Sequence, residues 1–103
     1  MARNESFFRQ VNERIREVGE RFEGDSFDFL CECANPSCTE RLTLSVSQYE
    51  DVRSSPTRFA LAPGHVAPEI EYVVEREDDH VVIEKHGIAG RVAAKLDPRA
   101  AGA

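Results

Sequence analysis

The chain has 103 residues and a net charge of −6, from 13 basic and 19 acidic side chains. This length predicts one domain with a modest core, and the acidic balance argues against binding to nucleic acid, which needs clustered lysine and arginine. The sequence has no apolar run of signal-peptide or membrane-helix length. We therefore expect a soluble, cytoplasmic domain over residues 1–98 and a frayed tail over 99–103.

Apolar residues near the N-terminus recur at spacings of three and four, which predicts an amphipathic helix. Its apolar face comprises Phe8, Val11, Ile15, Val18 and Phe22, and its exposed face comprises Arg9, Asn12, Glu13, Arg16, Glu17, Glu20 and Arg21. Asn4 suits the N-cap, and Gly24 suits the end of the helix. We expect the apolar face to pack on the sheet of the same chain; the alternative is that it binds a partner or a second copy.

Residues 27–33 alternate in polarity and predict a strand with two aromatic rings and two thiols on one face. The Asn-Pro-Ser turn at 35–37 reverses the chain and brings Cys38 back to these thiols. A second strand over 41–46 then pairs antiparallel with the first.

A short helix is predicted next, because Ser-Gln-Tyr-Glu at 47–50 fits a capping box. Tyr49 and Val52 then face the core, and a following proline prevents the helix from continuing. An extended segment over 58–62 leads to the Pro-Gly-His turn at 63–65, where glycine permits the bend that presents the imidazole.

Two β-branched runs, 69–76 and 80–85, flank a polar loop and predict a hairpin. Alternating carboxylates in and just after the first run indicate a strand edge that faces water; the alternative is an acidic docking face for a basic partner. These carboxylates are Glu69, Glu71, Glu75 and Glu77. Asp78, Asp79 and His80 at the tip are expected to be solvated.

The last predicted element is a short helix. Its apolar positions, Ile88, Val92 and Leu96, recur every four residues. Asp97 and Pro98 then close it, and the predicted tail follows.

The three cysteines, Cys31, Cys33 and Cys38, lie within eight residues. An odd number of closely spaced thiols suits metal ligation in a reducing compartment better than a disulfide framework. Three thiolates and an imidazole are ligands that tetrahedral zinc prefers, so we predict a Cys3His zinc site with His65 as the fourth ligand. Ordinary core thiols, a redox-active disulfide and an iron–sulfur cluster are the alternatives.

The fourth ligand decides what such a site can do. His65 is favoured over His80 and His86 because it lies on a turn whose fixed backbone can aim the ring. Four protein ligands leave no position for water, so the zinc is structural. Thiolates remain open to oxidants, which makes a redox- or metal-sensing regulator the second hypothesis. An enzyme with an open zinc site is the third, because no other catalytic motif is present.

Several short motifs are spread over nearly the whole chain: Asn12-Glu13-Arg14-Ile15, Cys31-Glu32-Cys33, Cys38, Tyr49-Glu50, Val52-Arg53, Pro56, Arg58-Phe59 and Pro63-Gly64-His65. At these residues the chain resembles an uncharacterised family of small actinobacterial proteins. The resemblance implies a bacterial protein in which the cysteines and the Pro-Gly-His turn belong to one site. It implies no activity.

Together these patterns predict an α+β domain, with an N-terminal amphipathic helix on a small, mainly antiparallel sheet. A Zn²⁺ ion would join the first hairpin to the turn at 63–65. The predicted function is that of a small protein-binding or regulatory module whose zinc is structural. Its expected partner is another protein, not nucleic acid or a membrane.

Overall fold

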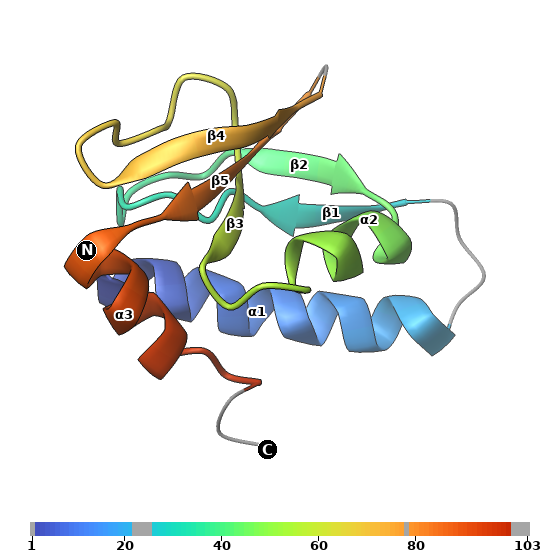
Figure 1. Cartoon of the computed structure of the whole chain (residues 1–103). Coiled ribbons are helices and arrows are strands. Elements are labelled where there is room, and N and C mark those ends of the chain that lie inside the picture. The colour runs from blue at the N-terminus through green and yellow to red at the C-terminus, as the bar shows by residue number, and fades with distance from the viewer. Residues whose placement is uncertain (1, 22–25, 78, 100–103) are drawn as a thin grey trace.

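The computed structural model describes residues 2–21, 26–77 and 79–99 and confirms the α+β fold (Figure 1). In chain order the elements are α1 (Ala2–Arg21), β1 (Phe27–Leu30), β2 (Arg41–Leu44), α2 (Val46–Val52), β3 (Arg58–Leu61), β4 (Glu71–Arg76), β5 (Val81–Lys85) and α3 (Gly87–Lys95). The strands in these ranges form two antiparallel sheets, of order β1-β2 and β3-β5-β4. No helix in the described part is both long and apolar enough to cross a membrane.

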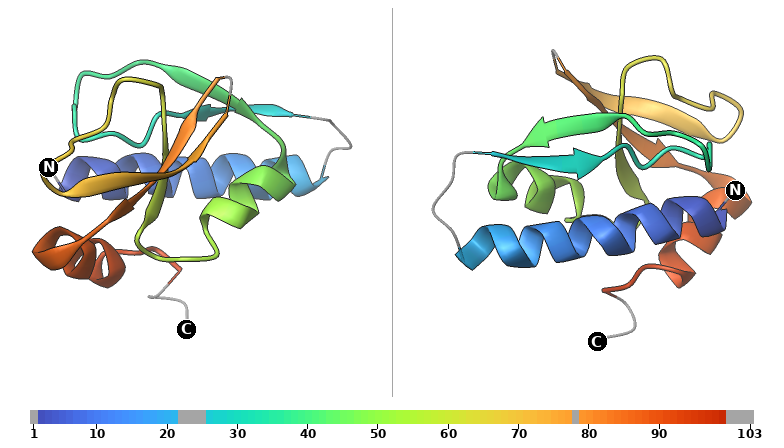
Figure 2. Two further views of the ribbon diagram at one scale, coloured as in Figure 1. Left: turned by 45° about the horizontal axis from the view of Figure 1, so that its top comes forward. Right: turned by 180° about the vertical axis from the view of Figure 1, so that it is seen from behind.

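The helix α1 runs along one side of the molecule and contacts β1, α2 and α3 (Figures 1 and 2). The core lies between this helix and the two sheets. Its largest apolar members are Phe29, Leu42, Leu44, Tyr49, Phe59, Leu61 and Ile83. The ring of Phe29 stacks on that of Tyr49 with centroids 4.6 Å apart, which ties the first sheet to α2.

The first hairpin is confirmed, with β1 and β2 antiparallel. Strand β1 ends at Leu30, before the cysteines. Beyond it, the amide of Cys31 still donates to the Glu40 carbonyl at 3.1 Å, whereas the amide of Glu32 donates to Ala60 in β3 at 2.8 Å. The segment that carries the first two thiols therefore links the two sheets.

The helix α1 packs on the sheets as predicted, but the face that it buries most deeply is not the predicted one. The helix buries Arg9, Asn12 and Glu13, which we expected to be exposed, together with Glu5. On the predicted apolar face, Val18 is 54% exposed. The amphipathic pattern is real, and Ile15 of its apolar stripe packs against the core, but polar residues form most of the buried interface.

The buried polar face of α1 satisfies backbone groups at the ends of strands. Asn12 accepts from the amide of Leu30 at 2.7 Å and donates to its carbonyl at 2.9 Å. Arg9 donates to the carbonyls of Pro56, at 2.8 Å, and Arg58. Buried backbone groups need partners, so polar side chains stabilise this interface where apolar ones would leave carbonyls unbonded.

The ends of α1 bear on two further predictions. The helix begins at Ala2, so Asn4 lies inside it and is not the N-cap. Arg21 is the last described residue of the helix. The predicted end at Gly24 and the apolar residue Phe22 lie outside the described residues.

The short helix α2 is confirmed, but its cap lies two residues earlier than predicted. The hydroxyl of Ser45, not of Ser47, accepts from the amide of Gln48 at 3.0 Å. The side chain of Gln48 in turn accepts from the amide of Ser45 at 2.8 Å. Tyr49 and Val52 are buried, as predicted.

The helix α3 packs through small residues instead of its predicted apolar face. Gly90 and Ala93 are buried, whereas Ile88 is 71% exposed and Leu96 is also exposed. A Cβ atom on Gly90 would lie 2.8 Å from the carbonyl oxygen of Lys85. The backbones approach so closely that larger side chains are excluded from this contact.

The second hairpin, β4 with β5, is confirmed, but its carboxylates do not form one water-facing row. Glu71 is buried and pairs with Lys85, which also pairs with Glu5. A register shift between Val73 and Glu75 breaks the alternation, so the later carboxylates face away from Glu71. The other three predicted members of the row are exposed.

Candidate metal centre

The four predicted ligands meet at one end of the molecule. Cys31 and Cys33 follow β1, Cys38 follows the next turn, and His65 follows β3. One ligand atom from each of the four lies within 4.8 Å of all the others. No other such group of histidine, cysteine or acidic residues occurs in the described ranges.

The cysteine loop is shaped by Asn35. Its side-chain oxygen accepts from the amide of Ser37 at 3.0 Å, and its carbonyl accepts from the amide of Cys38 at 3.1 Å. Such bonds to the local backbone are the reason that asparagine favours turns. They turn the chain back so that Cys38 faces the two thiols at the end of β1.

A second turn presents His65. The amide of His65 donates to the carbonyl of Ala62 at 3.2 Å, and Gly64 has a φ of 84°. This is the arrangement of a type II turn, which requires positive φ at its third residue and so favours glycine. The amide of Ala62 also donates to Cys31 Sγ at 3.1 Å, which fixes the turn against the first thiol.

Two distances from the imidazole of His65 fit tetrahedral zinc. His65 Nδ1 lies 3.6 Å from Cys31 Sγ and 3.6 Å from Cys38 Sγ. With Zn–S bonds of about 2.3 Å and Zn–N bonds of about 2.0–2.1 Å, a tetrahedron has N···S edges of about 3.6 Å. The geometry is therefore compatible with a Cys3His zinc site that binds the ring through Nδ1.

Burial raises the pKa of both Cys31 and Cys33, and repulsion between the clustered thiolates raises it further. Bonds from the backbone, such as that of the Ala62 amide to Cys31, oppose the shift only in part. Metal ligation needs thiolates. A bound cation supplies the positive charge that keeps buried thiols deprotonated, so metal binding is expected to release protons.

The cluster can be reached from one side. Cys31 and Cys33 are almost fully buried, whereas Cys38 and His65 are half-buried. A surface hollow of about 340 Å³ is lined by Cys33, Ala34, Asn35, Gly64 and His65. A metal ion or a small oxidant can approach the thiols through this hollow.

The other two histidines lie away from the cluster. His80 is buried at the tip of the second hairpin, where its Nδ1 lies 2.8 Å from Asp79 Oδ1. His86 stacks on Tyr72 with centroids 4.8 Å apart. Of the three candidate histidines, the structure brings only His65 to the thiols.

Glu32, which was not predicted to have a role, lies between two of the thiols and points away from them. It is fully buried and accepts from Asn12 at 2.9 Å, the Tyr49 hydroxyl at 2.7 Å and the amide of Ala60 at 3.1 Å. These bonds hold the cysteine segment to α1, α2 and β3. Its place between two inward-facing thiols was the available signal, since alternation directs it to the opposite side.

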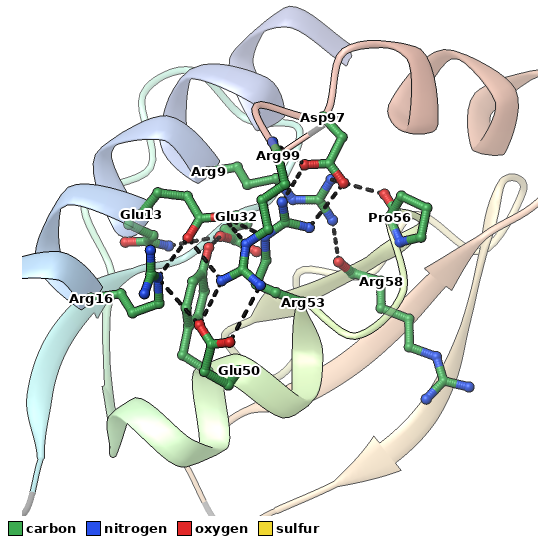
Figure 3. A network of polar contacts seen from close by, with 12 residues as sticks. Arg9, Glu13, Arg16, Glu32, Glu50, Arg53, Pro56, Arg58, Asp97 and Arg99 are labelled. Atoms are coloured by element: carbon green, nitrogen blue, oxygen red, sulfur yellow. Dashed lines mark hydrogen bonds and ion pairs between the residues drawn. The ribbon is translucent and has the colours of Figure 1, made fainter. Parts of the chain in front are cut away.

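A second polar cluster, here called the arginine network, lies between α1, α2 and the segment after α3 (Figure 3). It consists of Arg9, Glu13, Arg53, Asp97 and Arg99. Arg53 donates to Glu13 at 3.1 Å and to both carboxylate oxygens of Asp97. Arg99 donates to Glu13 and also to Glu50. The predicted tail therefore begins with a residue bound to two helices, and 100–103 lie outside the described residues.

The arginine network strongly favours ionised Glu13. Burial opposes ionisation, but hydrogen bonds from Arg99 and Arg16 and the charge of Arg53 outweigh it and lower the pKa to about 2. Burial likewise disfavours the charged form of Arg53, but its bond to Asp97 raises the pKa of the guanidinium overall. Each charge in this cluster depends on its partners.

The case for a metal centre rests on the four side chains and their positions in the fold. Three thiols and one imidazole converge at distances suited to a metal ion. The thiols and the imidazole come from two short segments that are far apart in the sequence. Comparisons of the chain with models of protein families, with curated proteins and with solved structures find no match.

Proposed function

We propose that the chain is a small cytoplasmic protein-binding or regulatory module in which Cys31, Cys33, Cys38 and His65 hold a structural Zn²⁺ ion. The convergence of all four ligand atoms supports this proposal. Four protein ligands complete a tetrahedron, so no position remains for a water molecule or a substrate. The metal then supplies stability, and an enzyme with an open zinc site is disfavoured.

The contact with another protein is expected through α1 and not through the carboxylates of β4. Glu71 is buried against Lys85, which removes it from the acidic docking face considered from the sequence. In contrast, α1 leaves Phe7 59% and Val18 54% exposed. Exposed apolar residues in contiguous patches are typical of interaction sites.

The experiment is metal analysis of the purified chain, followed by the substitution His65→Ala. We expect one zinc per chain, and at least about a tenfold loss of zinc affinity in the variant because one of four ligands is gone. His86→Ala is the matched control, since His86 stacks on Tyr72 away from the thiols. Zinc affinity and stability unchanged by His65→Ala would overturn the closed site and reopen the enzyme hypothesis.

A redox- or metal-sensing regulator is the second candidate, and the hollow beside Cys33 and His65 favours it. Oxidation of zinc-bound thiolates to a disulfide by a peroxide releases the metal, with two electrons passing from two thiolates to the peroxide. A chromogenic zinc chelator should then report zinc release under mild peroxide. Zinc that stays bound, with thiols that stay reduced, would remove this candidate.

A further inference from the structure

The helix α1 carries an apolar stripe on the side that faces away from the buried polar interface. The stripe comprises Phe7, Val11, Ile15 and Val18. Together with Arg14 and Phe27, the last three line a groove of about 280 Å³. In the right-hand view of Figure 2, α1 lies in front of the other elements and runs along one side of the fold. Phe7 and Val18 of the stripe are exposed, whereas Val11 and Ile15 are half-buried and Ile15 also packs against the core. The outer part of the stripe is therefore available for a second contact.

One wall of the groove is held in place by the fold. The ring of Phe27 lies over Gly19, where an added Cβ atom would come within 3.0 Å of the ring and of a Val46 methyl. The glycine therefore lets β1 and α2 lie close against the helix. Because the Phe27 ring packs against Gly19 and the core, this wall of the groove is formed without a partner.

The charges beside the stripe differ from those on the other side of the helix. Arg16 pairs with Glu13, Glu20 and Glu50. Arg14 and Glu17, which flank the stripe, are exposed and have no ion pair within the described part of the chain. Arg21 is likewise exposed and has no ion pair within the described residues. The helix thus offers two unpaired cations and one unpaired anion next to an apolar surface, and Arg14 and Glu17 are three positions apart.

We propose that this stripe binds a second copy of the chain, with the two α1 helices antiparallel about a two-fold axis. In this arrangement Arg14 of each copy lies opposite Glu17 of the other, so one pairing occurs twice. The apolar stripes then bury each other between these charges. The inference rests on the proposed function, because it names the partner of the same protein-binding module.

A second copy fits better than a partner of single charge. The unpaired charges are of both signs. An antiparallel copy places its Glu17 opposite Arg14 and its Arg14 opposite Glu17, so each of these two charges meets one of opposite sign. The rim residues Arg14, Glu17 and Arg21 sum to +1, whereas the whole chain carries −6. The rim of the contact therefore does not carry the net negative charge by which two acidic chains repel each other.

Sedimentation equilibrium of the zinc-loaded chain tests the contact, at about 1 to 100 µM. We expect a dimer for the natural sequence and, for Val18→Glu, a dissociation constant raised by about 100-fold, because two buried valines become charged. Val74→Glu is the matched control, since Val74 is an exposed valine on β4, and it should leave the dimer intact. A natural chain that is monomeric throughout, or a Val18→Glu variant that still dimerises, would overturn the inference.

Charge variants test the two-fold arrangement even if Val18→Glu disturbs the helix. Arg14→Glu and Glu17→Arg should each weaken the homodimer, by about threefold to tenfold, because each places like charges opposite one another. An equimolar mixture of the two should form a heterodimer, whose facing charges are again opposite. A mixture no tighter than either variant alone would overturn the arrangement.

Zinc is measured in every sample, so the two proposals fail separately. A monomer with one zinc per chain contradicts only the pairing of α1 helices. A dimer that contains no zinc contradicts the structural metal and leaves the pairing intact.

Discussion

The metal centre and the arginine network join different parts of one fold with positive charge from different sources. At the metal centre, three thiols and an imidazole could hold a cation taken up from solution. In the arginine network, the cations are guanidinium groups of the chain itself, buried among Glu13 and Asp97. If zinc binds as proposed, the junction between the segment after β1 and the turn after β3 depends on metal supply as well as on the bonds of Glu32 to Ala60. The junction of α1, α2 and the segment after α3 needs no metal.

Removal of zinc should give the largest effect, and it should act on the metal centre and leave the arginine network in place. We expect a strong chelator to lower the free energy of unfolding by about 5 kcal/mol or more, because structural zinc binding is coupled to folding. Hydrogen exchange should quicken first at Cys38 and His65, whose amides close the two ligand turns. A chelated protein with unchanged stability and exchange would contradict a structural role for the metal.

Substitution of Arg53 should break the arginine network. Arg53→Met leaves Glu13 and Asp97 partly buried without this cation, which should cost about 3–5 kcal/mol of unfolding free energy. Zinc content should stay at one per chain in the folded fraction. Arg91→Met, at an exposed position of α3, is the matched control and should cost less than about 0.5 kcal/mol. A loss below about 1 kcal/mol for Arg53→Met would show that the buried pairs contribute little.

Acid should weaken the arginine network through Glu13. Its pKa falls from the ordinary 4.5 to about 2 in the folded chain, so its contribution is complete above pH 4.5 and is lost as pH falls toward 2. The shift corresponds to no more than about 3 kcal/mol. Urea unfolding should therefore show a difference between the natural chain and Glu13→Gln that is largest near neutral pH and shrinks in acid.

The comparison with Glu13→Gln is necessary because protons also displace zinc from thiolates and imidazole. That loss is common to both proteins and cancels in the difference. A difference that does not change with pH would contradict the role of Glu13 as an ionised partner of the arginines.

Arg16 should give the smallest effect. It pairs with three carboxylates, but its side chain is partly exposed and two of those partners lie at the surface. Arg16→Ala should cost less than about 1 kcal/mol, and Arg16→Lys should recover part of it. Thermal unfolding measures both. If Arg16→Ala destabilised the chain as much as Arg53→Met, burial would not be what distinguishes the two arginines.

The sequence predicts the metal centre better than the arginine network, because the two clusters differ in how local they are. Three of the four ligands lie within eight residues, and the glycine before His65 marks its turn. The strands and the second hairpin were also predictable from alternation and β-branched runs. Each of these signals is contained in a short window, which is where patterns of polarity carry information.

The orientation of α1 could not be predicted for a physical reason. Arg9 and Asn12 are buried because strand ends far along the chain need hydrogen-bond partners there. Glu13 and Arg99 are separated by 86 positions, and no local pattern indicates that they meet. Periodicity identified the apolar stripe of the helix correctly, but not which face the core would require.

X-ray absorption at the zinc edge of the purified chain tests the central claim most directly. We expect one zinc per chain with three sulfur neighbours at about 2.3 Å and one nitrogen at about 2.0–2.1 Å. The nitrogen should be lost in His65→Ala and kept in His86→Ala. A chain that binds no zinc, or a zinc ion with a water oxygen in place of the nitrogen, would contradict the claim.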